Sequence, residues 1–200
     1  KKPSAGIFLE IDEGHRRQLV EMFQVKMEAK ANKEEFKMLS TFLLDNEVDI
    51  LDWSLENFTS ESSIRREVTE FEKELNTNGV VLEKRHGKLI LGGAEDQIRK
   101  FFRNKLLSGV THYNLDEMNQ TGCVGDGRIQ ELNQIMNQQL KQYQFSVAHD
   151  YRHYLLLDLL IFDIRWHRGY RVEQYNQLDS NSPKIIETYL LARDLLNEIT

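Results

Sequence analysis

Apolar side chains recur at helical spacing over much of the chain. Between residues 36 and 75 they form three stripes that repeat at intervals of three or four residues, the spacing of one face of an α-helix. The third stripe is followed by Asn78-Gly79, a pair that tolerates the left-handed conformation at a helix end. The pattern therefore predicts three successive helices. The stripes are Phe36, Leu39 and Leu43; Leu51, Leu55 and Phe58; and Ile64, Val68, Phe71 and Leu75.

Two short apolar runs follow the third stripe. Val80-Val81-Leu82 and Leu89-Ile90-Leu91 flank Arg85-His86-Gly87-Lys88. This order is typical of a strand, a tight turn and a second strand. Three helices and a hairpin in this order predict a winged helix-turn-helix with the hairpin as its wing, and a further helix is predicted from Glu95 to about Ser108.

The chain changes character at residues 109–127. This segment has four glycines and no sustained periodicity, which predicts a linker. Beyond it, residues 151–165 are apolar almost all round and predict a central, buried helix, while Ser182 and Pro183 are placed to open a last helix. The fold class is therefore mainly α, a winged helix-turn-helix followed by an all-α bundle over 128–200. The outer stripes of that bundle are Ile129, Leu132, Ile135, Met136 and Leu140, and Ile185, Tyr189, Ala192, Leu196 and Ile199.

Composition narrows the class of protein. The 200 residues are 40% hydrophobic and 29% charged, as in ordinary globular chains, and no run reaches the ~18 apolar residues of a membrane span. The one cysteine, Cys123, forms no disulfide within the chain, which favours a reducing, cytoplasmic location. A net charge of −6 excludes extended coating of nucleic acid, so any DNA contact must come from a local patch.

The third predicted helix carries the candidate DNA contacts. In a helix-turn-helix the second helix of the pair buries one face and presents the other to the major groove. Ser60 is placed to cap this helix, whereas Glu61 suits the helix N-terminus but would repel a nearby phosphate. The alternative interpretation is an ordinary solvated face. We predict groove contacts by Ser62, Arg65, Arg66 and Thr69, and phosphate contacts by the wing residues Lys84, Arg85 and Lys88.

A repeat links the start of the chain to the wing. Residues 6–17 resemble residues 88–99, with Phe8 at the position of Ile90 and Arg17 at that of Arg99, a constant offset of 82 residues. An offset close to one winged-helix unit favours a duplication. We therefore expect residues 1–30 to be the end of a first winged helix and residues 31–108 to be a second. On this interpretation the chain is part of a longer protein.

Residues 58–102 resemble the second winged helix of bacterial activators that carry PTS regulation domains, of the mannitol- and mannose-operon type. The wider class includes Mga-like virulence regulators and sugar-operon antiterminators. The resemblance rests on a small-residue turn, on the spacing of the recognition helix and on a shared motif. That motif is Gly87, Leu91, Gly93, Glu95, Ile98 and Arg99.

Residues 155–169 resemble the start of a PTS regulation domain, which extends the resemblance to 128–200. Arg165 and Gly169 fit the family's spacing. In the family, a histidine seven positions before this arginine accepts a phosphoryl group, and Asp158 occupies that position here. The resemblance therefore implies that this copy has lost the ordinary switch or carries a permanent negative charge in its place.

The sequence thus predicts a non-enzymatic regulator without a cofactor. Its expected function is transcriptional control of sugar-utilisation genes, with double-stranded DNA and sugar phosphotransferase proteins as partners of a homodimer. Two alternatives remain open. In the first alternative, residues 31–108 form a dimerisation or interaction module that binds no DNA. Their twelve basic and fifteen acidic side chains favour it. In the second, the segment His149 to His153 belongs to a metal-dependent HD-type hydrolase, because histidines at i and i+4 share one helical face.

Overall fold

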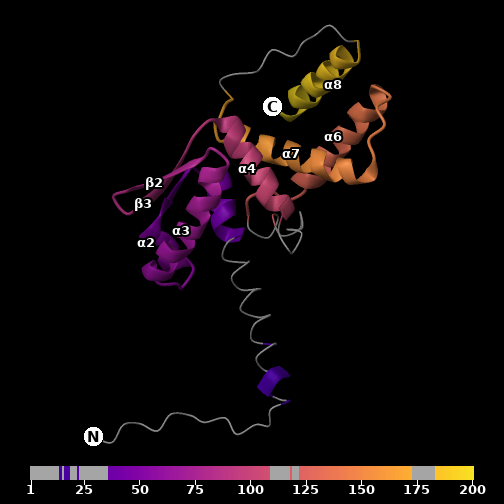
Figure 1. Cartoon of the computed structure of the whole chain (residues 1–200). Helices are drawn as coiled ribbons and strands as arrows, with labels where there is room; N and C mark the ends of the chain where they lie inside the picture. The colour runs from indigo at the N-terminus through magenta and orange to yellow at the C-terminus, as the bar shows by residue number, and fades with distance from the viewer. Residues whose placement is uncertain are drawn as a thin grey trace, which may run out of the picture. The chain divides into compact units, whose positions relative to one another are not determined.

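The computed structural model describes residues 14, 16–18, 22, 36–108, 118, 122–172 and 183–200. Lys1–Lys37 forms one unit, whose described residues are helical, and Met38–Thr200 forms a second (Figure 1). The second unit is mainly helical with one small sheet, in agreement with a winged helix-turn-helix. After a helical segment at residues 36–44, its elements are β1 Glu47–Asp49, α2 Ile50–Glu56, α3 Glu61–Thr77, β2 Val81–Arg85, β3 Lys88–Gly92, α4 Glu95–Ser108, α6 Arg128–Gln142, α7 His149–His167 and α8 Pro183–Ile199.

The sheet has three antiparallel strands in the order β1-β3-β2. Arg85 lies opposite Lys88 in the β2–β3 hairpin, and Val48 lies opposite Leu89 in the β1–β3 pair. The hairpin confirms the predicted wing. Strand β1 was not predicted, because three residues are too few to show an alternating pattern.

The wing turns through His86 and Gly87. Both residues have positive φ, +51° and +82°, as the two-residue turn that matches the twist of hairpin strands requires. Strands β1 and β3 bury every second side chain, whereas β2 buries only Leu82. Buried on this inner face are Leu82, Leu89 and Leu91.

The core of the winged helix contains the third predicted stripe and part of the first. Leu39 and Leu43 are buried, and so is the whole stripe of α3. The Phe71 ring of α3 stacks on Phe42 at 5.9 Å between centroids and meets Phe101 of α4 edge-on at 5.5 Å. This aromatic cluster packs α3 against the helical segment before β1 and against α4. Helix α3 ends at Thr77 as expected, with Gly79 at φ +73°.

The second predicted stripe is wrong. Helix α2 begins at Ile50, because the Asp49 side chain caps it by accepting from the amides of Leu51 and Asp52 at 2.9 and 3.2 Å. This start turns Ile50 and Trp53 toward the core. These two residues are three positions apart, which fits one face of a helix as well as the four-residue spacing of Leu51 and Leu55 does. The residues expected in the core are exposed instead, at 55%, 65% and 98% for Leu51, Leu55 and Phe58.

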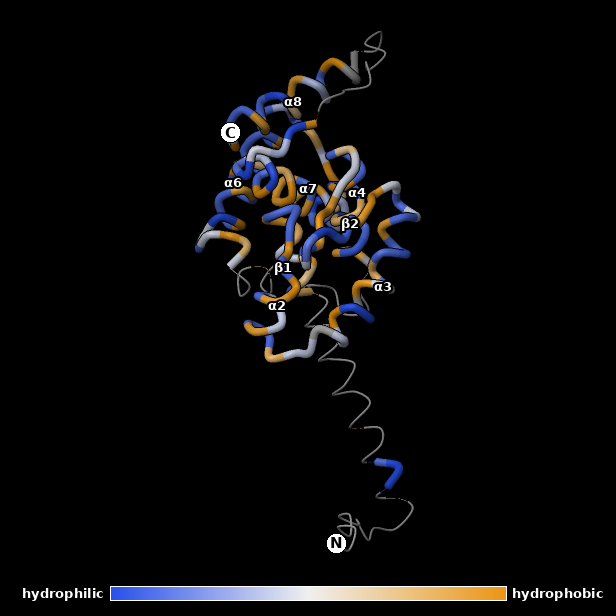
Figure 2. Tube along the Cα trace, turned by 90° about the vertical axis from the view of Figure 1, so that its left-hand side faces the viewer, coloured by the Kyte–Doolittle hydropathy of each residue, from blue (hydrophilic) through white to orange (hydrophobic). Residues whose placement is uncertain are grey.

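Helix α7 is the central helix of the remaining part, as predicted. It contacts both α4 and α6, and Figure 2 shows it between them. Helix α8 packs on α6, and its buried side chains are Leu191, Leu195 and Ile199. Of the predicted stripe, Ile199 is therefore correct, whereas Tyr189 is 56% exposed and Ala192 is exposed. Ser182 lies outside the described residues. Buried on α7 are Leu156, Leu157, Leu159, Leu160, Ile161 and Ile164.

Three described residues of the predicted linker 109–127 are buried. Met118 is 1% exposed, Cys123 8% and Val124 6%. The Cys123 thiol donates to the carbonyl oxygen of Ser40, at 3.6 Å. At Cys123 the segment therefore packs against the helical segment before β1.

Candidate nucleic-acid interface

The N-terminus of α3 is capped by a serine cluster. Ser60 Oγ accepts from the amide of Ser63 at 3.2 Å, and it lies 2.8 Å from Ser62 Oγ. This confirms the expected N-cap. The cap fixes where α3 begins and therefore which side chains its outer face carries.

The four predicted groove residues lie on one exposed face of α3. Ser62, Arg65, Arg66 and Thr69 are all exposed, opposite the buried stripe that begins at Ile64. The Thr69 hydroxyl donates to the carbonyl oxygen of Arg65 at 2.8 Å. The face thus presents two guanidinium groups and two hydroxyl side chains, which suit hydrogen bonds to base edges.

Acidic residues flank this face. Helix α3 has five acidic and three basic side chains, but its 3.6-residue turn directs Glu72 and Glu74 to opposite sides of the helix. Glu72 pairs with Lys84 of the wing at 2.6 Å, and Glu74 pairs with Lys105 of α4 at 2.5 Å. Helix α3 is thereby tied to both of its neighbours.

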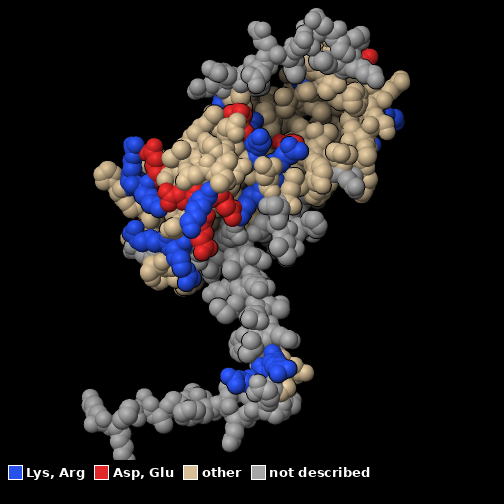
Figure 3. All heavy atoms as spheres, viewed as in Figure 1, with Lys and Arg blue, Asp and Glu red and all other residues tan. Residues whose placement is uncertain are grey.

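All three predicted phosphate contacts on the wing are in ion pairs. Figure 3 shows Lys and Arg intermixed with Asp and Glu over α3 and the hairpin, without one continuous basic patch. The Glu47 hydrogen bond and charge raise the pKa of Lys88, so this lysine is cationic at neutral pH. Exposed pairs of this kind contribute only about 0–1 kcal/mol, so a phosphate competes for each lysine or arginine. The pairs are Lys84 with Glu72 and Arg85 with Glu83, both at 2.6 Å, and Lys88 with Glu47.

Sequence reasoning missed these acidic partners. Glu83 is next to Lys84 and Arg85 in the sequence, so a local signal existed for it. Glu47 lies 41 positions from Lys88 and belongs to the strand that the sequence did not predict. Glu72 appears in the sequence only as one charge among several on the solvated side of α3.

Asp158, at the position of the family's phosphate acceptor, is half-buried on α7. Its carboxylate lies 3.3 Å from Arg103 Nε of α4. Burial raises the pKa of Asp158, and the charge of Arg103 opposes that rise. The position is therefore occupied by an acid that already has a basic partner on the neighbouring helix.

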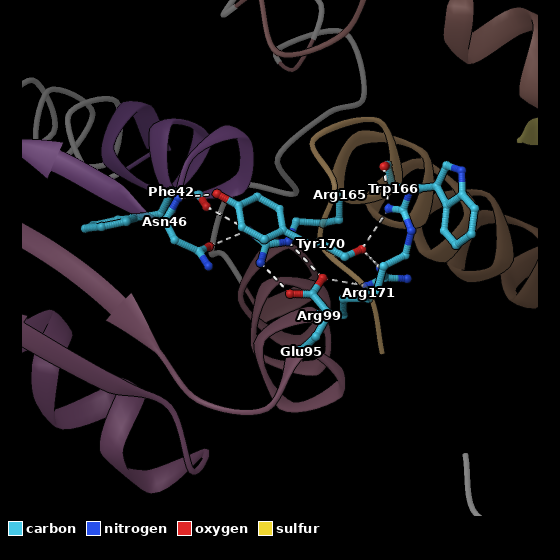
Figure 4. Close-up of polar contacts among 8 residues, drawn as sticks. All are labelled: Phe42, Asn46, Glu95, Arg99, Arg165, Trp166, Tyr170 and Arg171. Carbon is cyan, nitrogen blue, oxygen red and sulfur yellow. Dashed lines mark hydrogen bonds and ion pairs between the residues drawn. The ribbon is translucent and has the colours of Figure 1, made fainter. Parts of the chain in front are cut away.

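The motif at the start of α4 and the motif near the end of α7 lie far apart in the sequence but meet in a buried ion pair. Arg165 of α7 is fully buried and donates to both carboxylate oxygens of Glu95, through Nε at 2.9 Å and Nη2 at 2.5 Å (Figure 4). Glu95 also accepts from Arg99 Nε, at 2.8 Å. The winged-helix motif and the α7 motif thus form one cluster, which their separation of 70 residues concealed.

His149 and His153 are exposed at the start of α7. In the part of the chain that the structure describes, no three side chains of His, Cys, Asp or Glu are grouped so as to hold a metal ion. None of the described helices is long and apolar enough to cross a bilayer.

Comparison with known proteins supports the DNA-binding part. Residues 18–106 match the family model of the Mga helix-turn-helix domain, a DNA-binding domain family of regulators. The match begins before the predicted boundary at residue 31 and ends in α4, so α6, α7 and α8 lie outside it. No curated protein matches the chain. The match indicates a DNA-binding transcriptional regulator, and it agrees with the Mga-like branch of the resemblance.

Proposed function

We propose, on the premise that residues 18–106 contain an Mga helix-turn-helix domain, that the chain binds double-stranded DNA with α3 in the major groove and the β2–β3 wing on the backbone. The observation that carries the proposal is the exposed face of α3, on which two arginines follow a capped helix N-terminus. Arginine pairs in bidentate fashion with guanine, and serine or threonine hydroxyls bond to any base. The proposed groove contacts are Ser62, Arg65, Arg66 and Thr69.

The wing is proposed to position the domain without reading bases. Lys84, Arg85 and Lys88 lie within one hairpin beside α3, and cationic side chains on a wing bind phosphates irrespective of sequence. Each must exchange a carboxylate for a phosphate on binding. Because that exchange preserves one ion pair, its net cost is small compared with the desolvation of an unpaired charge.

The regulatory part of the proposal rests on the resemblance of residues 155–169 to a PTS regulation domain. On this proposal the chain is a non-enzymatic, cofactor-free regulator of sugar-utilisation genes that acts as a homodimer, and sugar phosphotransferase proteins act on it. Asp158, paired with Arg103, is proposed to hold a fixed negative charge where the family has a switchable one. Incubation with the phosphorylated general phosphotransferase proteins is expected to leave residues 128–200 unlabelled.

The groove contacts are tested by removing the two arginines together. The double variant Arg65→Ala/Arg66→Ala is expected to lose specific binding to the DNA upstream of its own gene, measured by fluorescence anisotropy over a salt series. The slope of log affinity against log salt falls by about 0.9 for each phosphate that the protein no longer neutralises. Binding that is unchanged in this variant would exclude α3 as the reading helix.

A matched control removes two charges elsewhere. Lys141 of α6 and Arg193 of α8 are exposed, and their replacement by alanine lowers the net positive charge by the same amount. Lys141→Ala/Arg193→Ala is expected to retain the affinity of the natural chain, because neither residue lies on the winged helix. An equal loss in both double variants would show a non-specific charge effect.

The second candidate function is an interaction module that binds no DNA. The observation in its favour is that every predicted phosphate contact on the wing is already paired with an acid. If the natural chain shows no salt-dependent binding to its upstream DNA, this candidate replaces the first.

A further inference from the structure

We propose that Arg165 is a positioning residue for the DNA-binding surface and that it holds the wing at its base. The proposal concerns a residue on α7, outside the range that matches the helix-turn-helix family. The expected effect of Arg165 on DNA binding rests on the proposed function, whereas its expected effect on the position of the wing does not.

Arg165 joins three points of the winged helix. Its Nη1 donates to the carbonyl oxygen of Phe42 at 3.3 Å and to Asn46 Oδ1 at 2.7 Å, and its remaining donors bind Glu95. Phe42 belongs to the last turn of the helical segment 36–44, Asn46 precedes β1, and Glu95 begins α4 directly after β3. One guanidinium group therefore holds both strands of the β1–β3 pair at the same end, where β1 begins and β3 ends (Figure 4).

Tyr170 completes the cluster. Its ring centroid lies 3.8 Å from the Arg165 guanidinium carbon, and its hydroxyl accepts from the amide of Asn46 at 3.0 Å. Its carbonyl oxygen accepts from Arg99 Nη2 at 3.1 Å. The C-terminal end of α7 and the residues that follow it thus contact the base of the sheet through several independent bonds.

The base of the sheet determines where the wing lies. Strand β3 is the central strand, and the amide of Leu91 donates to the carbonyl oxygen of Asn46 at 2.6 Å. Glu95 follows the end of β3 by three residues. A shift of Glu95 or Asn46 therefore moves β3, and with it the turn that carries Arg85 and Lys88. On the other side, the wing meets α3 through Lys84 and Glu72.

Arginine is the residue that this position requires. Its planar fork has five N–H donors, and here they reach a carboxylate, an amide oxygen and a backbone carbonyl at once. The carbonyl of Phe42 is one of the acceptors that a helix leaves unpaired at its C-terminus, where a cation is favourable. A lysine ammonium lacks the planar geometry and does not reproduce the set.

The polarity of the α4–α7 contact supports the same role. Glu95 of α4 pairs with Arg165 of α7 at one end, and Arg103 of α4 pairs with Asp158 of α7 at the other. Helix α4 therefore supplies the acid at one end of the contact and the base at the other, and α7 supplies the opposite charges. A reversal of α7 on α4 would bring like charges together, and a slide would separate both pairs, so the two pairs specify one register of α7 relative to the start of α4.

The experiment compares three variants of the whole chain. Arg165→Met removes the guanidinium at similar length, and Tyr170→Phe removes only the hydroxyl that accepts from Asn46. The matched control is Arg128→Met, since Arg128 of α6 also donates twice to a buried carboxylate of α7, that of Asp163, at 2.7 and 3.1 Å. Arg128 also pairs with Glu131 and donates to the carbonyl oxygen of Ile199, neither of which belongs to the sheet.

The first measurement is hydrogen exchange of the β1–β3 amides, which needs no DNA. The amides of Leu91 and Ile50 bond to Asn46 and Gly87 across this pair. We expect their exchange to become faster in Arg165→Met and, to a smaller extent, in Tyr170→Phe, and to be unchanged relative to the rest of the chain in Arg128→Met. Equal effects of Arg165→Met and Arg128→Met, or no effect of Tyr170→Phe, would overturn the proposal.

The second measurement is the salt dependence of DNA binding. Loss of folded protein lowers the fraction that binds without changing the slope, whereas a displaced wing lowers the slope by about 0.9 for each phosphate that it no longer reaches. We expect the lower slope in Arg165→Met and Tyr170→Phe but not in Arg128→Met. If the natural chain does not bind DNA, the proposed function fails, while the exchange measurement still decides the role of Arg165.

Discussion

At the scale of single residues, Arg165 and Glu95 form a buried ion pair that is costly to break. Breaking a buried ion pair by removing one partner typically costs about 3–5 kcal/mol, because the other charge stays buried. Arg99 also donates to Glu95, so the carboxylate keeps one partner and the loss is expected at the lower end of that range. For the same reason Tyr170→Phe is the gentler probe of the cluster.

Two aspartates of the helical part are expected to affect stability in opposite directions. Burial raises the pKa of Asp158, against the charge of Arg103. A carboxyl with a raised pKa binds its proton more tightly in the folded chain, so its contribution to stability falls as the pH rises through that pKa. The hydrogen bond from Tyr143, and then the one from Arg193, lower the pKa of Asp194. Asp194 therefore stabilises the fold above its unfolded pKa, and this contribution is lost as the pH falls through the folded one.

Urea unfolding at a series of pH values from 7 down to 3 tests this contrast. At pH 7 we expect Asp158→Asn to raise the free energy of unfolding and Asp194→Asn to lower it. Both differences shrink as the pH falls, because each aspartate becomes protonated in the folded and the unfolded chain alike. Changes of the same sign at pH 7 in the two variants would contradict this account of Asp158.

Among the helices and strands, the ion pair between α3 and the wing limits the charge available to DNA. Lys84 is held by Glu72, so we expect Glu72→Gln to release this lysine and to strengthen DNA binding. The slope of log affinity against log salt should stay the same, because Lys84 already exchanges its carboxylate for one phosphate when the natural chain binds. Fluorescence anisotropy over a salt series measures both quantities.

The same helix offers the control. Glu74→Gln removes an equal charge from α3, but its partner Lys105 lies on α4 and not on the wing. We expect a smaller increase in affinity and no change in slope. An identical response of the two variants would mean that only the net charge of α3 matters.

The elements that sequence predicted best are those whose own residues determine their position. The stripe from Ile64 to Leu75 has one helical phase, and its end at Asn78-Gly79 needs no tertiary contact, so α3 was predicted correctly. Helix α2 was not, because Ile50 with Trp53 and Leu51 with Leu55 are both acceptable helical faces. The choice between them is made by the Asp49 cap and by the packing of Trp53, and packing is not a property of the local sequence.

In the candidate site too, the sequence predicts which residues are exposed, but it does not predict their ion-pair partners. The exposure of Arg65, Arg66 and the hairpin residues follows from position on an element, and sequence places them correctly. The partners of the wing residues follow from the sheet, since Glu47 reaches Lys88 only because β1 pairs with β3. The cluster of Arg165 with Glu95 requires the packing of α7 on α4, for which no pattern along the chain is a signal.

For the molecule as a whole, residues 38–200 behave as one compact unit. The sequence predicts a winged helix and a helical bundle joined by a linker. The structure connects these parts through the α4–α7 ion pairs and through the buried residues of the linker segment. A displacement of α7 therefore has a direct mechanical route to the base of the wing through the described contacts.

The buried thiol of Cys123 makes this connection measurable in unlabelled protein. It is the one cysteine of the sequence and it bonds to Ser40 of the DNA-binding part. Alkylation requires opening, and when reclosing is fast its rate is proportional to the population of the open form. We expect slow alkylation of the natural chain and faster alkylation of Arg165→Met, followed by mass spectrometry. Equal rates would mean that residues 122–124 open independently of the α4–α7 contact. A chain with a single, sheltered thiol thus reports chemically on whether its winged helix and its helical part stay together.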